Sequence, residues 1–348
     1  MKQKKKSPKR PRIAIIYHRV PLESSDLYYS RQNTVIDDDT EKTVQCVEKL
    51  LKRRKFRVSV IALELDDLSP IADIKSDFIF NLVDSKQMEL KIARILERMH
   101  IPYSGSGFLA LSASDSKVKT KAIFKLHNLP TPEFSVIGPK DKLLRSLLPS
   151  KFPVMVKPAF EHGSVGITSK SVVTSFMQFK KRVKRIRTTL KQSLICERFI
   201  RGRELQVTVL ESDGMTRALP VSEMIVQNVK NNKWNIYGFD EKWKKNGTIY
   251  KNLHFFAPAK GISVSILRTI QRQCICAFYA FGFRDYARFD IRYNPKTKQW
   301  FFLEGNGNPG ISEASDDSMT ASLEASGISL EEFVLQIIEN HLHLGLLE

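Results

Sequence analysis

Three side chains with oxygen donors lie at the ends of two predicted strands in the C-terminal part of the sequence. Asp290 lies within ARFDIRY, and Glu304 and Asn306 end WFFLEGN. The alternation of apolar and polar residues in ARFDIRY predicts a strand, WFFLEGN is predicted as its partner, and Asn-Pro-Lys at 294–296 predicts the turn between them. In an antiparallel pair, Glu304 and Asn306 share one face of the sheet, and Asp290 can lie opposite them.

Two carboxylates and one amide at a single point favour a magnesium site. Magnesium prefers oxygen ligands and takes substrate phosphates into its shell, so these residues suit a nucleotide-phosphate site better than a zinc or iron site. The alternative is a hairpin whose polar ends are solvated. The apolar run 300–303 disfavours that alternative, because an acid is costly to bury unless it is paired or bound to metal.

A loop of small residues follows the predicted strand FPVMVKP, which contains Lys157. Gly163 and Gly166 let the backbone approach a ligand closely, so that its N–H groups can surround a phosphate, and Lys157 adds a positive charge. The loop has neither the Walker sequence nor the dinucleotide fingerprint. Taken alone, it is equally consistent with a hairpin tip.

The composition is that of a globular protein with more than one domain. At about 150 residues per domain, 348 residues predict two or three domains. No apolar run approaches the ~18 residues that would span a bilayer, and the basic N-terminus lacks the apolar stretch of a secretory signal. The four cysteines have neither metal-ligand spacing nor the density of a disulfide framework. These features predict a cytoplasmic protein without a membrane segment.

The net charge of +19 is concentrated in two segments. Residues 1–12 form a basic tail that we expect to be disordered. In KKRVKRIRTTLK, at 180–191, Val183, Ile186 and Leu190 follow helical spacing, so the charges are expected on a solvated face. The positive field favours anionic substrates and non-specific contacts with nucleic acid, but no recognition motif predicts dedicated nucleic-acid binding.

The order of predicted elements divides the chain into domains. Strands at RIAIIYH, FRVSVIAL and DFIFNLV, with a helix at about 40–54, predict a parallel sheet. A helix at about 88–99 follows, and then a lysine-rich helix from about Ser116 that Asp115 could cap. Further strands are predicted at FPVMVKP, 171–173, LICERFI and, as an antiparallel pair, around 212–214, with helices at about 264–282 and 329–341. The predicted units are a tail at 1–12, a βαβ domain at 13–115, a small subdomain at 116–203 and a C-terminal subdomain at 204–348.

Several motifs occur in a fixed order along the chain: IPYSGSG with DSKVKTK, LPTP, PVMVKPAFEHGSVG, ICERFIRGRELQVTV, ARFDIRY, FFLEGNGNPG and ASGISLEEFV. Over roughly residues 75–340 this order resembles the ATP-grasp superfamily and, within it, the D-alanine-D-alanine ligase family. The resemblance implies an ATP-grasp fold of mixed α/β and α+β class. In that fold an N-terminal parallel-sheet domain precedes two α+β subdomains that clasp a nucleotide between them.

The resemblance also implies roles for individual residues. Those assigned to the nucleotide are Lys117 and Lys157 at the phosphates, Gly163 and Ser164 in the loop that closes over them, Glu197, Phe199 and Ile200 at the adenine, Glu204 at the ribose and Lys242 in a lid. Asp290, Glu304 and Asn306 would hold magnesium, or manganese in its place. Arg288 would stabilise a tetrahedral intermediate, and Ser164 would contact the γ-phosphate. Arg288 and Ser164 are therefore the catalytic candidates.

Each of these residues has a simpler interpretation when it is taken alone. Lys157 could be an exposed strand end, Glu204 a surface partner of Arg203, and Arg288 a partner of Asp285. The shared order of the motifs argues against a common accidental origin.

The amino-acid half of the sequence departs from the family pattern. NLVDSKQMEL replaces an acidic, glycine-rich loop, and Glu23 is the sole candidate for the glutamate that orients the first amino acid. Trp243 stands where a tyrosine is common, and Gly163 replaces one of two adjacent serines. Gly310 and Ser315 keep positions that the resemblance assigns to substrate binding.

We therefore expect an ATP-dependent, ADP-forming ligase that joins a small carboxylate to an amine through an acyl phosphate, with substrates other than two D-alanines. The added lysines predict that a substrate, or the product chain being extended, is anionic. The alternative is a regulatory or interaction protein that binds nucleotide without turnover, although the retained Arg288 disfavours it. A nucleic-acid-associated protein is a third alternative, and a homodimer is left open.

Overall fold

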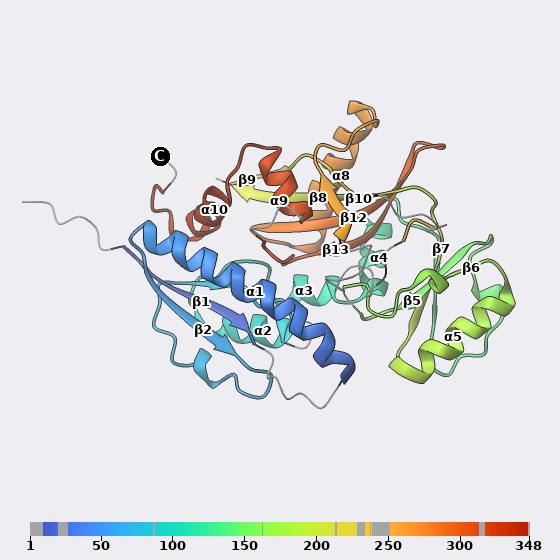
Figure 1. Ribbon diagram of the computed structural model, residues 1–348, viewed down its shortest axis with the longest axis horizontal. Helices are drawn as coiled ribbons and strands as arrows, with labels where there is room; N and C mark the ends of the chain where they lie inside the picture. Colours follow the sequence, from blue (N-terminus) through green and yellow to red (C-terminus); the bar gives the residue numbers. More distant parts are fainter. Residues whose placement is uncertain are drawn as a thin grey trace, which may run out of the picture.

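The computed structural model contains three β-sheets that follow one another along the chain (Figure 1). In Figure 1 the N-terminal sheet is blue, the second sheet is green, and the third sheet runs from yellow to red between them. None of the helices among the described residues is long and apolar enough to span a membrane. The structure describes residues 10–19, 27–85, 88–161, 163–212, 214–227, 234–236, 238, 251–312 and 317–346, of which 27–39 are described by their backbone alone.

The N-terminal sheet is parallel and has the order β2-β1-β3. Its elements are β1 (Arg12–His18), α1 (Leu27–Arg53), β2 (Arg57–Leu63), the 3-10 helix η1 (Ser69–Ile71), β3 (Phe78–Asn81) and α2 (Glu89–Met99). Alternate residues of β1 face opposite sides, because Ile13 and Ile15 share a core cluster with α1 whereas Ala14 and Ile16 share one with α2. Burial on both faces explains why this strand is almost wholly apolar.

The second sheet is antiparallel and has the order β4-β7-β5-β6. Its elements are β4 (Phe134–Ile137), η2 (Arg145–Leu147), β5 (Val154–Pro158), η3 (Ser169–Ser171), β6 (Val172–Val173), α5 (Phe176–Leu190) and β7 (Leu194–Arg198). As their spacing predicts, Val183 and Ile186 of α5 are buried in the core of this sheet. Arg182 is also buried, so the prediction that the charges of this helix form a solvated face is wrong for one residue.

The third sheet is antiparallel and has the order β11-β10-β8-β12-β13, with β9 paired to β8 as well. Its strands are β8 (Arg203–Ser212), β9 (Met215–Ala218), β10 (Ser222–Val226), β11 (Leu253–Phe256), β12 (Tyr286–Asn294) and β13 (Gln299–Asn306). The helices α3 (Phe108–Ser114), α4 (Lys117–Leu126) and α8 (Val264–Phe281) contribute to its core, where Phe124, Phe278 and Phe289 belong to one cluster. One face of β12 and β13 is therefore packed against these helices.

Two helices end the described chain, α9 (Ser318–Glu324) and α10 (Leu330–Leu342). A capping box starts α10, because Ser329 and Glu332 each accept the backbone N–H of the other. Phe333 and Ile337 of α10 share a core cluster with Ile13 of β1 and with Tyr286 of β12. The last helix thus joins the N-terminal sheet to the third sheet.

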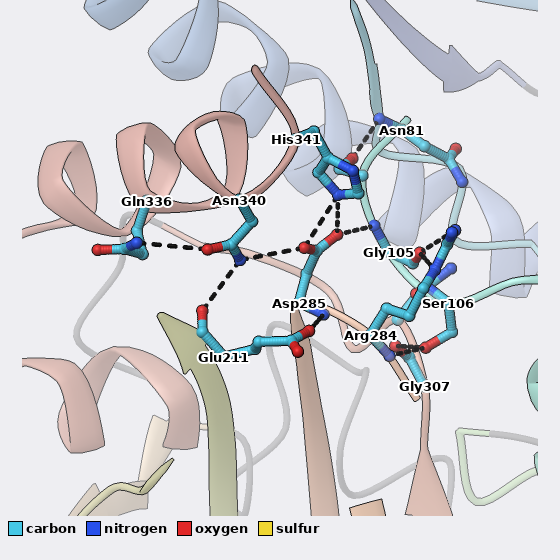
Figure 2. A network of polar contacts seen from close by, with 12 residues as sticks. Asn81, Gly105, Ser106, Glu211, Arg284, Asp285, Gly307, Gln336, Asn340 and His341 are labelled. Atoms are coloured by element: carbon cyan, nitrogen blue, oxygen red, sulfur yellow. Dashed lines mark hydrogen bonds and ion pairs between the residues drawn. The ribbon is translucent and has the colours of Figure 1, made fainter. Parts of the chain in front are cut away.

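A buried network around Asp285, the residue before β12, reinforces this junction (Figure 2). Asp285 is 1% exposed and accepts hydrogen bonds from the Gly105 N–H at 2.6 Å, Asn340 Nδ2 at 3.2 Å and His341 Nε2 at 3.0 Å. Figure 2 shows the two α10 side chains converging on this carboxylate opposite Gly105. The loop before α3, the start of β12 and the end of α10 are therefore fixed to one another.

The structure also corrects several predicted elements. The helix α1 begins at Leu27, well before the predicted start, and β4, β11, α3 and α9 were not predicted. Asp115 does not cap the lysine-rich helix, because the Ser116 hydroxyl accepts the Lys119 N–H at the start of α4. The second strand of the predicted pair is split into β9 and β10 around Pro220, which has no N–H to donate. The domain boundaries stay predictions.

Candidate functional site

A cavity of about 120 Å³ lies between the second and third sheets. Lys157 on β5 and Glu197 on β7 line it from one side, and Arg288, Asp290 and Glu304 on β12 and β13 line it from the other. Six further residues that the sequence assigned to the nucleotide also line this cavity: Lys117, Gly163, Ser164, Phe199, Ile200 and Glu204. The structure therefore brings together side chains from α4, two sheets and the glycine loop.

The two acids predicted to bind metal lie opposite each other on neighbouring strands. Asp290 and Glu304 are register partners, as predicted, and a bulge follows this pair. Gln206 Nε2 donates to Asp290 Oδ1 at 3.2 Å, and Arg288 Nε donates to it at 2.9 Å. Asn306 is the register partner of Arg288 but does not line the cavity, so its place in the metal site stays a prediction.

Two predicted phosphate-binding lysines surround Glu304. Lys117 Nζ lies 3.1 Å from Glu304 Oε1 and donates to the Glu161 carbonyl at 2.6 Å. Lys157 Nζ lies 3.7 Å from the same carboxylate oxygen. Lys157 is 2% exposed, which contradicts its interpretation as an exposed strand end. Both ammonium groups therefore point at the acid that is expected to bind metal.

Glu197 lies between two lysines at the inner end of the cavity. Lys157 Nζ is 2.8 Å from one carboxylate oxygen, and Lys121 Nζ is 2.8 Å from the other. Burial alone would raise the pKa of Glu197, but the two ammonium groups lower this pKa to about 2. Burial lowers the pKa of Lys121 to about 8, although Glu197 acts in the opposite direction. The carboxylate is thus ionised at neutral pH and held from two sides.

Glu204 is paired with a different arginine from the one suggested by its sequence neighbours. Arg292 Nη1 donates to Glu204 Oε2 at 3.1 Å, whereas Arg203 forms its ion pair with Glu223. Arg292 is 3% exposed, and its Nε also donates to the Ile200 carbonyl at 3.1 Å. Likewise, Arg288 pairs with Asp290 and not with Asp285. The interpretations of Glu204 as a surface partner of Arg203 and of Arg288 as a partner of Asp285 are therefore wrong.

Three residues of the glycine loop have a backbone conformation that favours glycine. Gly163, Ser164 and Gly166 have φ angles of 56°, 66° and 71°, in the left-handed region. A Cβ at Gly166 would lie 2.8 Å from the Pro158 Cγ, so a larger residue would force the loop away from β5. Arg182 donates to the Gly166 carbonyl and, at 2.7 Å, to the Ser171 hydroxyl. Helix α5 therefore anchors the C-terminal side of the loop.

The segment after β13 approaches one of the segments that depart from the family pattern. Ser106 Oγ donates to the Gly307 carbonyl at 3.1 Å, which attaches this segment to the N-terminal part of the chain. A Cβ at Gly310 would lie 3.1 Å from Asp84 Oδ2, and Asp84 belongs to NLVDSKQMEL. The segment NLVDSKQMEL thus lies next to Gly310, a predicted substrate residue.

Four predicted site residues lie outside the described part of the chain: Glu23, Lys242, Trp243 and Ser315. Their roles, including the lid around Lys242, stay predictions.

Sequence reasoning missed three residues that hold the site together: Lys121, Arg182 and Arg292. For each of them, the spacing from a neighbouring residue in the sequence could have indicated its position. Lys121 follows Lys117 by one helical turn and so shares its face of α4, and Arg182 lies on the same stripe as Val183 and Ile186. Arg292 is two residues after Asp290 and so points to the same face of β12.

Comparisons with known proteins identify the family to which the chain belongs. Residues 123–339 match the family model described as the D-ala D-ala ligase C-terminus. The D-alanine-D-alanine ligase of Cupriavidus pinatubonensis is 30% identical over 244 residues, which cover 70% of this chain and 69% of that protein. The same enzyme of Acidovorax ebreus is 31% identical over 243 residues, covering 70% and 68%.

Two solved structures share the fold. The D-alanine-D-alanine ligase of Bacillus anthracis complexed with ATP has a TM-score of 0.72 at 20% identity, over 95% of this chain and 96% of that one. The VanG D-Ala:D-Ser ligase of Enterococcus faecalis has a TM-score of 0.69 at 17% identity, over 94% and 98%. By its fold and by its sequence, this chain belongs to the D-alanine-D-alanine ligase family of ATP-grasp proteins.

Proposed function

We propose that this protein is an ADP-forming ligase that uses ATP to join a small carboxylate to an amine. The observation that carries the proposal is the grouping of Arg288, Asp290 and Glu304 with Lys117 and Lys157 around one cavity. A protein that only binds nucleotide needs the lysines and the acids. It has less need of an arginine placed to stabilise an oxyanion.

The acidic pair fits a divalent cation of the magnesium type. Asp290 and Glu304 bring two carboxylates to one register position, and the nearest cations, Arg288 and Lys117, balance their charge without displacing them from the cavity. Asp290 and Glu304 would hold the metal, with Asn306 as the proposed third ligand. A bound magnesium or manganese ion would neutralise phosphate charge.

The other cavity residues divide between the parts of the nucleotide. We assign Lys117, Lys157 and the loop with Gly163 and Ser164 to the phosphates, because ammonium groups and backbone N–H groups favour anions. Glu197, with Phe199 and Ile200, is assigned to the adenine. Glu204, oriented by Arg292, is assigned to the ribose hydroxyls, and Lys242 to a lid.

In the proposed reaction the substrate carboxylate attacks the γ-phosphorus of ATP, and ADP leaves. The amine then attacks the carbonyl carbon of the acyl phosphate, and inorganic phosphate and a proton leave as the amide forms. The residues of this chain position the reactants and balance charge, with Arg288 facing the oxyanion of the tetrahedral intermediate. Closure of the glycine loop would exclude water, which would otherwise hydrolyse the acyl phosphate.

We further propose that the substrates differ from two D-alanines. The segment that contains Asp84 departs from the family pattern and adjoins Gly310. The side chain of Asp84, within this segment of altered sequence, therefore lies next to a residue assigned to substrate. An anionic substrate stays a prediction from the basic composition.

The test is to incubate the protein with MgATP and pools of D- and L-amino acids, hydroxy acids and short peptides, and to measure phosphate release. Hydroxylamine added in place of the amine should trap the acyl phosphate as a hydroxamate. Arg288→Met should keep MgATP binding and lower phosphate release by about 10²–10³-fold, whereas the exposed Arg272→Met on α8 should change neither. MgATP binding without phosphate release from any pool would instead support the binding-protein alternative.

A further inference from the structure

The two lysines that hold Glu197 are not equivalent. Lys157 and Lys121 are each 2.8 Å from one oxygen of the carboxylate, and both are almost fully buried. Lys157 lines the cavity, whereas Lys121 does not and contacts Glu197 from behind it. A ligand in the cavity can therefore reach Lys157 but not Lys121.

Lys121 is fixed in this position by contacts with several elements. Its Nζ also donates to the Thr131 hydroxyl at 2.9 Å, and that hydroxyl donates to the Phe302 carbonyl of β13 at 2.9 Å. The ring of Phe134 lies 5.8 Å from the same ammonium group. Lys121 thus connects α4, the segment before β4, β7 and β13, and besides its ion pair with Glu197 it has a hydrogen bond to Thr131 that fixes its direction.

Lys157 has alternative partners within the cavity. Besides Glu197, its ammonium group lies 3.7 Å from Glu304, the acid proposed to bind metal. Binding of a nucleotide phosphate requires Lys157 to give up at least part of its contact with Glu197. A buried carboxylate that loses its counter-ion is strongly destabilised, so this exchange is unfavourable unless a second cation stays with Glu197.

We propose that Lys121 is a positioning residue that remains the counter-ion of Glu197, so that Lys157 is released to the phosphates of the nucleotide. The inference rests on the proposed nucleotide site. It makes Glu197 the point at which phosphate binding and base binding are coupled. With Lys121 present, Glu197 stays ionised and keeps its direction toward the base while Lys157 changes partner.

The experiment compares Lys121→Met, Glu197→Gln and the double variant in the full chain, by calorimetry with MgATP and with magnesium tripolyphosphate. Tripolyphosphate has no base, so its affinity depends on the phosphate-binding groups, including the availability of Lys157, and not on contacts with the base. Lys121→Met should weaken binding of both ligands by about tenfold, because Lys157 becomes the sole counter-ion of Glu197. Adding Glu197→Gln to that variant should restore the affinity for tripolyphosphate, since a neutral amide no longer retains Lys157.

Thermal melting will show whether each variant is folded. If Lys121→Met alone does not fold, the double variant carries the test, because it removes both charges of the pair. It should bind tripolyphosphate as tightly as Glu197→Gln does, since Lys121 has no role once residue 197 is neutral. A double variant that binds about tenfold more weakly than Glu197→Gln would overturn the proposal.

A folded Lys121→Met variant with wild-type affinity for tripolyphosphate would also overturn it. Loss of MgATP affinity without loss of tripolyphosphate affinity would do the same, since it would confine the role of Lys121 to the base. If the wild-type protein binds MgATP but never releases phosphate, the ligase function fails while the Lys121 comparison stands. If the wild-type protein binds neither ligand, both proposals are overturned.

Discussion

Glu304 is the residue at which the proposed metal site meets the phosphate-binding lysines. It faces Asp290 across the strands, and Lys117 Nζ lies 3.1 Å from its carboxylate. Glu304→Gln should leave the fold intact, because the amide keeps the shape of the side chain and Lys117 keeps the Glu161 carbonyl as a partner. Affinity for MgATP should fall by at least ~10–100-fold, the cost typical of losing even an outer-shell partner, and phosphate release should be lost.

Calorimetry with MgATP and a phosphate-release assay measure these two effects. Glu324→Gln, an exposed acid on α9, is the control for a change of one charge. Unchanged activity in Glu304→Gln would show that the metal is bound elsewhere.

At the scale of elements, Asp285 holds the start of β12 to the rest of the molecule. Asp285→Ala should destabilise the fold by about 3 kcal/mol or more, because it leaves the buried Gly105 N–H and Asn340 amide without their acceptor. Alanine also tolerates the φ angle of 58° at this position less well than aspartate does. Asp285→Asn keeps one acceptor oxygen and should lose less. Urea unfolding measures the free energy of unfolding of both variants. An equal decrease in the two variants would mean that the second carboxylate oxygen does not contribute to stability.

We expect the stability of the fold to depend on pH because of His18, the last residue of β1. Burial lowers the pKa of His18 from its ordinary 6.5 to about 4, so the folded chain favours the neutral ring. Between these values the unfolded chain binds more protons, so stability is present above pH 6.5 and is lost as the pH falls toward 4. The loss amounts to about 3 kcal/mol. In urea unfolding experiments, the free energy of unfolding of His18→Gln should depend less on pH over this window than that of wild type. The control His343→Gln, at an exposed position, should keep the pH dependence of wild type.

The elements show which parts of the site could be predicted. The opposition of Asp290 and Glu304 depends on one hairpin, so a local turn was sufficient to bring the two acids to neighbouring strands. The bulge beside the pair was not predicted, and an uninterrupted ladder would place Leu303 opposite Asp290. The pairing of Glu204 with Arg292 depends on the register between β8 and β12, which no local pattern specifies. The sequence offered only the neighbour Arg203, as an alternative interpretation. Lys121 was missed for a similar reason, because its partner Glu197 lies on a strand of another sheet.

At the scale of the whole molecule, the cavity between two sheets predicts that nucleotide stabilises the fold. A ligand that contacts both sides is bound by the folded chain alone, so MgATP at a hundred times its Kd should add about 2.7 kcal/mol to the free energy of unfolding. Differential scanning fluorimetry should therefore show a higher Tm with MgATP than with magnesium alone. The same rise in Glu304→Gln would contradict the proposed metal site.

The position of α10 has a consequence for biosynthesis. Phe333 and Ile337 complete the same core as Ile13, so β1, which is synthesised well before α10, obtains these neighbours only after α10 has been made. Until then α1 covers only part of this face of the N-terminal sheet, and the part that α10 buries stays exposed. Such late, non-local closure slows folding and exposes the chain to aggregation, so shielding by a chaperone should increase the yield of native protein.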